Sequence, residues 1–312
     1  MVTVSVPGKI HLMGEHAVVY GKPALLAAIN LRLRVSVEAG TNGIDIVSSE
    51  PPDYIRHAIE VVKEQCKLTS LPPTKITVTS DIPAGYHLGS SAAIAVGVVA
   101  SLTYFLKKVW NPAAINQIAY EVEKKMHGNP SGGDNTAVTM GGFIWFRKEL
   151  EFLKSIWQLP FNLPKNLDHF FLINTGKPKE TTGEMVKYVN AKCQMLNAKY
   201  KTLFYKNEQQ TKRVAVAIKE GNEKELIDAI RLGERTLEGM GVVSRKVIPL
   251  IRKIEKSGGA AKILGGGGMA EGVGFLLCYH QKPSLIESLC KRYNYPIRTM
   301  RLSDEGIKLE SK

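Results

Sequence analysis

Three glycine-rich segments of the chain contain residues whose types and spacing suit catalysis. In the middle one, DIPAGYHLGSSAAIAV (81–96), the pattern predicts a strand, a loop and a helix that begins at Ser90 or Ser91. Free backbone N–H groups and the positive end of a helix dipole suit phosphate at such a place. The loop lacks the GxxxxGK[ST] pattern of a Walker A loop. A tight strand-to-helix turn with a serine cap fits the same residues.

The second segment, HGNPSGGDNTAV (127–138), places Asp134 in a loop rich in Gly and Asn just after a predicted helix. An exposed carboxylate there could accept the proton of a substrate hydroxyl. It could also simply organise a turn through its side chain. Glu123 lies eleven residues earlier on the predicted helix, where its position between other charged residues is equally typical of a solvated surface carboxylate.

The third segment, PGKIHLMGEHAVVYGKPAL (7–25), contains Lys9, Glu15 and His16 around a predicted strand and turn. Such a polar cluster could line a pocket, although a Lys–Glu pair is also common on protein surfaces. Near the other end of the chain, the tetraglycine 265–268 could form a further backbone cradle for an anion, or a flexible hairpin.

Alternating and helical patterns of apolar residues predict the elements that position these segments. The predicted strands are 2–10, 29–38, 75–83, 141–148 and 169–175, and the predicted helices are 53–66, 90–109 and one from Asn111, with a largely helical stretch at 181–256. Pro160 and Pro164 mark the predicted boundary between a first domain, residues 1–165, and a second, residues 166–312. Both halves are predicted to be α+β.

Composition is that of a globular protein, with 44% hydrophobic and 23% charged residues among 312, which excludes a disordered or collagen-like chain. Forty-two basic against 29 acidic residues give a net charge of +13, which favours phosphorylated small molecules, nucleic acid or an anionic membrane as partners. Four cysteines without a CxxC pair argue against a zinc site or a disulfide framework and suit a reducing compartment.

No stretch has the length of a membrane span, because the longest apolar run, 92–106, is shorter than the ~20 residues needed. The N-terminus also lacks the charged-then-apolar order of a secretion signal. We therefore expect a cytoplasmic protein without a membrane partner.

Taken in order, PGKIHLMGEHAVVYGKPAL, LGSSAA and HGNPSGGDNTAV resemble the motifs of the GHMP small-molecule kinases, and among them most closely those of the mevalonate kinases. LEGMGVVS (237–244) resembles the segment before the third motif of the mevalonate kinases. The resemblance covers nearly the whole chain. It implies an α+β fold of two domains, the N-terminal one like domain 2 of ribosomal protein S5 and the C-terminal one ferredoxin-like, with the active site between them.

The resemblance also assigns roles to residues. Asp134 matches the catalytic Asp, and Lys9 matches the Lys beside it that supports charge near the transferred phosphoryl group. Ser91 and Glu123 match the two side chains expected to hold Mg²⁺. Glu15, His16 and Thr181 match positions expected to line the mevalonate pocket. The expected ATP-binding residues are Gly85, His87, Leu88, Gly89, Ser90, Ser91 and Ala92.

Two motifs depart from the family pattern. His87 stands where the phosphate loop usually has glycine, so we expect either a different backbone path or a histidine at positive φ. Its imidazole is expected beside the triphosphate, in its protonated form. In the third motif, KILGGGGMAEG, Leu264 replaces a hydroxyl residue, and Met269 and Ala270 replace glycines.

The implied reaction is Mg²⁺-dependent transfer of the γ-phosphoryl group of ATP to the 5-hydroxyl of mevalonate, by a protein that could be a homodimer. One alternative is phosphomevalonate kinase or another GHMP small-molecule kinase. An alternative from a different class is a basic nucleic-acid-binding protein. The dispersed basic residues and the absence of an RNP-like or KH-like motif argue against nucleic acid as a partner.

Overall fold

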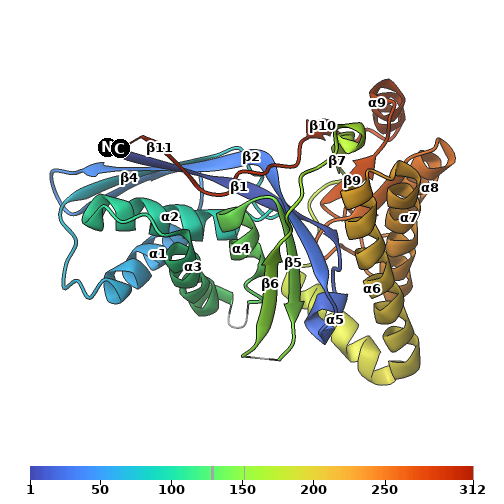
Figure 1. The fold of residues 1–312 in the computed structure, drawn as a ribbon, viewed down its shortest axis with the longest axis horizontal. Helices are drawn as coiled ribbons and strands as arrows, with labels where there is room; N and C mark the ends of the chain where they lie inside the picture. Colours follow the sequence, from blue (N-terminus) through green and yellow to red (C-terminus); the bar gives the residue numbers. More distant parts are fainter. Residues whose placement is uncertain (128–129, 151, 312) are drawn as a thin grey trace.

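The structure is a computed structural model that describes residues 1–127, 130–150 and 152–311. Figure 1 shows an elongated molecule with one sheet toward each end. The first sheet has seven strands: β1 (Val2–Met13), β2 (Ala24–Ala39), β3 (Ile44–Ser48), β4 (Thr74–Ser80), β5 (Phe143–Lys148), β6 (Lys154–Gln158) and β11 (Lys308–Ser311). Its main path runs β11-β1-β2-β4-β3, and β5 joins β2 to β6.

Helices cover one face of this sheet: α1 (Pro52–Gln65), α2 (Ser90–Lys107), α3 (Pro112–His127) and α4 (Gly133–Met140). Contrary to the expectation from the sequence, the described helix α2 is long and apolar enough for a membrane span, but 67% of its 18 residues are buried inside the molecule. A Cβ on Gly97 would lie 2.7 Å from Val35 Cγ2, so this helix packs closely on the sheet. It is therefore the central core helix of the first half.

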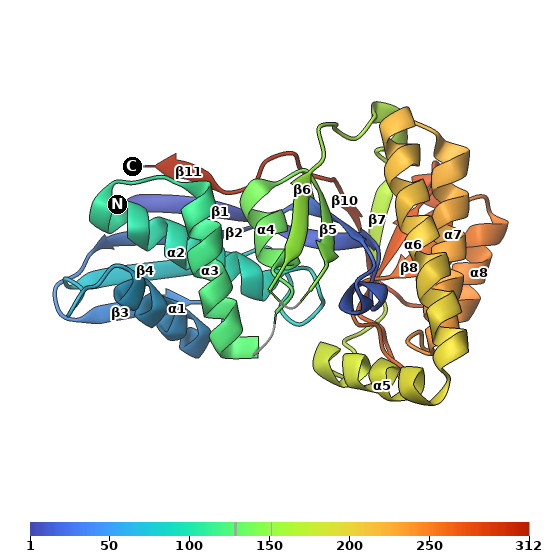
Figure 2. The same cartoon turned by 60° about the horizontal axis from the view of Figure 1, so that its bottom comes forward.

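The second sheet has four antiparallel strands in the order β10-β7-β9-β8: β7 (Phe170–Asn174), β8 (Ala260–Ile263), β9 (Phe275–Tyr279) and β10 (Ile297–Met300). Five helices accompany it: α5 (Thr182–Met195), α6 (Asn197–Glu220), α7 (Glu223–Met240), α8 (Ile248–Lys256) and α9 (Pro283–Arg292). Figure 2 shows α6, α7 and α8 at the outer side of this sheet and α5 beneath it. Two 3₁₀ turns, η1 (Ala17–Tyr20) and η2 (Lys165–Leu167), complete the elements.

The α+β prediction and the five predicted strands are confirmed, with shifted bounds. The strand predicted at 29–38 begins earlier, at Ala24, because it also pairs with β5. The stretch 181–256 divides into α5, α6, α7 and α8. The sequence predicted a loop where helix α4 lies, because residues such as those of GDNT (133–136) are typical of turns. In the structure, Gly132 in the left-handed conformation is the N-cap, and the helix begins at Gly133. Gly128 and Asn129 of that motif lie outside the described residues.

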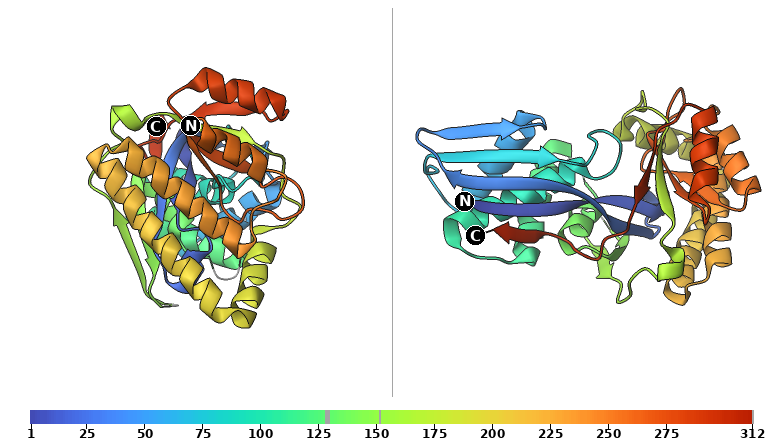
Figure 3. Two further views of the ribbon diagram at one scale, coloured as in Figure 1. Left: turned by 90° about the vertical axis from the view of Figure 1, so that its right-hand side faces the viewer. Right: turned by 90° about the horizontal axis from the view of Figure 1, so that it is seen from above.

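The end of the chain returns to the first sheet. Strand β11 pairs with β1, and Figure 3 shows both termini close together at that end of the molecule. The division at residue 165 stays a prediction, and the final strand contributes to the sheet of the other half.

Candidate active site

Lys9 and Asp134 form an ion pair between β1 and the first turn of α4. Lys9 Nζ lies 2.9 Å from Asp134 Oδ2, and His11 Nε2 lies 3.6 Å from Oδ1 of the same carboxylate. Lys9 and His11 are two residues apart on a strand, so both point to one face. The side chain of Asp134 is 37% exposed while that of Lys9 is buried, so the carboxylate remains accessible to a substrate.

The charge of this carboxylate follows from its neighbours. Burial by itself would raise the pKa of Asp134, but the Lys9 ammonium and the hydrogen bonds from His11 and Lys9 hold that pKa well below its ordinary value. Asp134 is therefore an anion at neutral pH. It can accept a hydrogen bond from a substrate hydroxyl while Lys9 provides positive charge beside it.

Close backbone contacts bring β1 against the loop that precedes α2. The backbone N–H of Lys9 donates to the carbonyl of Leu88 at 2.9 Å. A Cβ on Gly89 would lie 2.8 Å from Lys9 Cγ, and one on Gly8 would lie 2.9 Å from the Leu88 carbonyl oxygen. Glycine at both positions thus allows the loop to lie directly beside the Lys9–Asp134 pair.

The loop itself has an unusual backbone. Gly85, His87 and Gly89 have φ of 80°, 62° and 82°, and Gly89 is the N-cap of α2. The first-turn residues Ser90, Ser91 and Ala92 follow, so their N–H groups lie at the helix N-terminus, where phosphate is favoured. The Ser90 hydroxyl donates to Glu50 Oε2 at 3.3 Å. Leu88, by contrast, is buried in the core of the first half.

His87 adopts a positive φ, one of the two alternatives that the sequence left open, and its ring contacts the other half of the molecule. Its Nδ1 lies 3.0 Å from Thr182 Oγ1, and a Cβ on Gly265 would lie 2.4 Å from His87 Cβ. Burial, followed by the charge of Lys9, lowers the pKa of His87 to about 4. Without a bound triphosphate these surroundings favour the neutral imidazole, because desolvation and positive charge both oppose protonation. The protonated form was expected beside bound ATP.

Glu123 and Ser91, the expected metal ligands, share a neighbour that the sequence did not reveal. Tyr54 on α1 is an electrostatic neighbour of both side chains. Glu123 is 4% exposed, and its Oε1 has no hydrogen-bond partner within the described residues. Burial and the negative charge of Asp134 raise the pKa of Glu123 to about 8. Burial and the charge of Glu123 also raise the pKa of Tyr54.

This donor set fits Mg²⁺, which takes a few carboxylate or hydroxyl oxygens together with phosphate oxygens and water. A buried carboxylate oxygen without a partner is the strongest sign of such a ligand here. The described residues contain no group of three His, Cys, Asp or Glu side chains suited to a metal. A cation at this place would therefore depend on a bound phosphate chain as well.

The three residues expected to line the mevalonate pocket lie in different surroundings. Glu15 is buried and pairs with Lys262 of β8. His16, at φ 59°, is buried with its Nε2 3.0 Å from the Gly266 carbonyl oxygen. Thr181 is exposed and caps α5, where its hydroxyl and backbone N–H both bond to Glu184. Glu15 and His16 thus contact the third-motif segment, and their role toward a substrate stays a prediction.

The third motif folds as a tight loop around its glycines. A Cβ on Gly267, at φ 71°, would lie 2.1 Å from the Val242 carbonyl oxygen. Leu264 is fully buried in the core, which explains an apolar residue in place of a hydroxyl. The N–H groups of Met269 and Ala270 donate to Glu180 Oε1 at 3.3 and 3.2 Å. The altered residues therefore have structural partners of their own.

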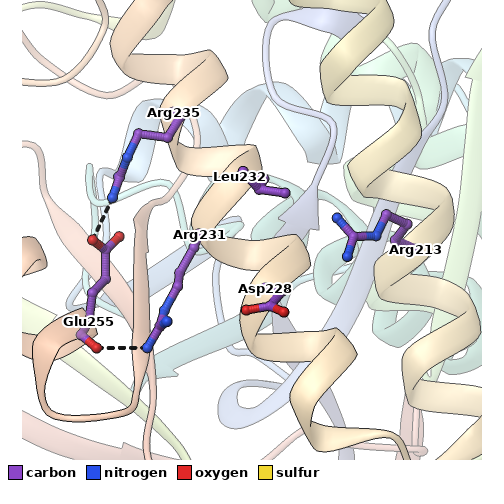
Figure 4. A pocket seen from close by; sticks show the side chains of 6 residues that line it. All are labelled: Arg213, Asp228, Arg231, Leu232, Arg235 and Glu255. Atoms are coloured by element: carbon purple, nitrogen blue, oxygen red, sulfur yellow. Dashed lines mark hydrogen bonds and ion pairs between the residues drawn. The ribbon is translucent and has the colours of Figure 1, made fainter.

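A hollow of about 390 Å³ lies away from these residues, on the outer side of α7. Figure 4 shows its lining of Arg213, Asp228, Arg231, Leu232, Arg235 and Glu255. Arg235 pairs with Glu255, and Arg231 donates to the backbone carbonyls of Glu255 and Gly259. These guanidinium groups already bind acceptors of the protein itself. We therefore interpret the residues around the hollow as a structural network of ion pairs and not as a ligand site.

Comparison with known proteins shows the family of the chain. Residues 53–142 match the model of the GHMP kinases N-terminal domain. The chain is 34% identical to a mevalonate kinase of Archaeoglobus fulgidus over 271 residues, which cover 85% of this chain and 88% of that protein. It is 28% identical to the mevalonate kinase of Pyrococcus abyssi over 342 residues, covering 99% and 98% of the two chains.

Solved structures agree in fold. A crystal structure of a mevalonate kinase superimposes with a TM-score of 0.81 at 22% identity, covering 98% of this chain and all of that one. The Methanococcus jannaschii mevalonate kinase gives a TM-score of 0.79 at 22% identity, covering 96% and 98%. At 22% identity, these superpositions show that the fold is shared, and they show nothing further.

Proposed function

The chain belongs to the mevalonate kinases of the GHMP kinase family, and on that premise we propose that it transfers the γ-phosphoryl group of ATP to the 5-hydroxyl of (R)-mevalonate. The observation that carries the proposal for the site is the Lys9–Asp134 pair, which lies directly beside the loop that begins α2. A hydroxyl acceptor and a phosphate chain could meet there.

Phosphoryl transfer requires positioning and charge stabilisation more than covalent help from the protein. Asp134 accepts a hydrogen bond from the 5-hydroxyl and orients its oxygen toward the γ-phosphorus. The new O–P bond forms as the bond to the β,γ-bridging oxygen breaks, ADP leaves, and the hydroxyl proton passes to Asp134 or to water. The low pKa of Asp134 favours a late proton transfer, after much of the O–P bond has formed.

Lys9 supports the charge on the transferred group, since its ammonium is buried and faces the acceptor site. The expected ATP-binding residues of the loop, Gly85, His87, Leu88, Gly89, Ser90, Ser91 and Ala92, offer backbone N–H groups to the phosphates. Ser91 and Glu123 would hold Mg²⁺, which neutralises phosphate charge when bound. Glu15, His16 and Thr181 are proposed to face the mevalonate.

We further propose a cytoplasmic enzyme that works on small molecules without a membrane or nucleic-acid partner; a homodimer stays a prediction. The +13 net charge suits anionic substrates such as ATP. A salt-dependent gel shift with DNA or RNA would test the nucleic-acid alternative.

The function is tested by following ADP release with Mg²⁺-ATP and each of four acceptors: mevalonate, phosphomevalonate, homoserine and galactose. We expect mevalonate to have the highest kcat/KM. A higher value for phosphomevalonate would replace the proposal with phosphomevalonate kinase, and no release with any acceptor would overturn a kinase function for these compounds.

A further inference from the structure

A buried ionic cluster joins the two halves of the molecule at the end of β1. It consists of Glu15, just after β1, Lys262 on β8 and Glu234 on α7. Lys262 and Glu234 are 0% exposed, and Glu15 is 1% exposed. Fully buried charged side chains are rare and need specific partners. The resemblance to the kinases gave a role to Glu15 but none to Lys262 or Glu234.

Lys262 has a partner for each of its three N–H donors. Its ammonium pairs with Glu15 Oε1, donates to the His11 carbonyl oxygen at 3.2 Å and donates to the Ile263 carbonyl oxygen at 2.6 Å. Two of these acceptors belong to the end of β1 or the turn after it, and the third to the strand of Lys262 itself. The side chain therefore ties the second sheet to β1.

Glu234 completes the cluster from α7. Its Oε2 accepts the backbone N–H of Ile263 at 3.0 Å, and its Oε1 has no partner within the described residues. Burial raises the pKa of Glu234 well above its ordinary value, which favours the protonated acid. Lys262 and Glu15 then form one compensated charge pair. A pair of this kind is stable only while both partners are present.

Strand β1 needs this tie because its pairing with β2 is irregular around the catalytic residues. The register shifts between Pro7 and Gly8 and again between His11 and Met13. Lys9 and His11 lie between these two shifts and both face Asp134. Register shifts re-aim side chains but weaken the ladder that holds a strand. The bond from Lys262 to the His11 carbonyl fixes β1 at the second of these shifts.

We propose that Lys262 is a positioning residue, which holds β1 through Glu15 and the His11 carbonyl so that Lys9 and His11 meet Asp134 correctly. The kinetic part of this inference rests on the proposed function. Its structural part does not, because it concerns the order of β1 in the protein without substrates.

The test compares Lys262→Met with Lys22→Met. Lys22 Nζ lies 2.9 Å from Glu208 Oε2 on α6, so this pair also joins the turn after β1 to the second half, but at 30% exposure. The control thus also replaces a lysine by methionine in an ion pair that joins the segment after β1 to the second half of the chain. Hydrogen exchange of residues 8–16, followed by mass spectrometry, reports the order of β1 in both variants without any substrate.

We expect faster exchange of residues 8–16 in Lys262→Met and wild-type exchange there in Lys22→Met. We also expect kcat per folded molecule to fall at least about tenfold in Lys262→Met, since small displacements of reacting groups are costly, with the KM for ATP changed less than about threefold. Lys22→Met should retain wild-type kcat. A lower Tm in Lys262→Met with unchanged exchange and kcat would overturn the proposal and leave a merely structural pair.

A second variant covers failure of Lys262→Met to fold. Glu15→Gln/Lys262→Met leaves no buried unpaired charge, so it should fold, and only its exchange is interpreted. Faster exchange of residues 8–16 would support the proposal, and wild-type exchange would contradict it. If wild-type protein lacked activity toward mevalonate, the proposed function would fail while the exchange data still decided the role of Lys262.

Discussion

Glu123→Gln should stabilise the protein without substrates, and the stabilisation should grow as the pH rises. Glu123 is buried, and burial together with Asp134 raises its pKa from 4.5 to about 8. Between these two values the folded protein keeps a proton that the unfolded chain has lost. The free energy of unfolding therefore falls with rising pH in this window, by about 1.4 kcal/mol per pH unit for this one group. Below pH 4.5 both states hold the proton and the effect vanishes.

The size of the stabilisation follows from the difference between the two pKa values of Glu123, 4.5 and about 8. Ionising Glu123 in the folded state costs at most about 5 kcal/mol by pH 8. A glutamine has no proton to lose at these pH values and has nearly the size and shape of the glutamic acid that it replaces. With an unfolding entropy of about 2.1 cal/mol/K per residue, the Tm of Glu123→Gln should exceed that of wild type by about 4–7 °C near pH 8. Near pH 5 the difference should be about 1 °C or less.

Differential scanning calorimetry at several pH values measures this difference. Glu121→Gln is the matched control, because Glu121 lies on the same helix at 38% exposure and pairs with Lys124 at the surface. Its Tm difference should not grow with pH. A Tm difference for Glu123→Gln that is the same near pH 5 and pH 8, or a loss of stability near pH 8, would refute the reasoning.

Two further predictions concern Asp134 and His87. Asp134→Asn should lower kcat at least about 100-fold in an ADP-release assay, because the carboxylate that orients the hydroxyl becomes a neutral amide; near-wild-type activity of the folded variant would remove Asp134 from the mechanism. In the protein without ATP, a His87 pKa of about 4 keeps the ring neutral throughout pH 6–9. We expect its buried surroundings to keep it neutral when ATP binds as well, so wild type and His87→Gly should show parallel pH profiles of KM for ATP. A rise of KM with pH in wild type alone would restore the charged imidazole.

The sequence was sufficient to predict which residues form the candidate site where these residues lie in continuous motifs. The resemblance brought Lys9 and Asp134 together across 125 positions, and the structure places them in contact. For His87 the glycine pattern left two alternatives, a different backbone path or a positive φ, and the structure has the second. Helix α4 was missed because Gly, Asp and Asn are weak helix formers, and here tertiary contacts of its buried Ala137 and Val138 outweigh that preference.

The surroundings of these residues could not be predicted, because they depend on distant parts of the chain. Tyr54 lies in the helix predicted at 53–66, and it comes near Glu123 only because α1 packs beside α3. The partner of Glu15 is 247 positions away. The neutral state of His87 depends on burial against Thr182 and Gly265. Desolvation of this kind is a property of packing, which a local pattern does not contain.

Identification of the product tests the central claim most directly. Purified protein is incubated with Mg²⁺-ATP and (R)-mevalonate, and the mixture is followed by ³¹P nuclear magnetic resonance with coupling to protons. We predict one new phosphate monoester signal split by the two protons of C5, appearing in equal amount with ADP. A diphosphate product, phosphate on the 3-hydroxyl, or free phosphate with unchanged mevalonate would contradict the account.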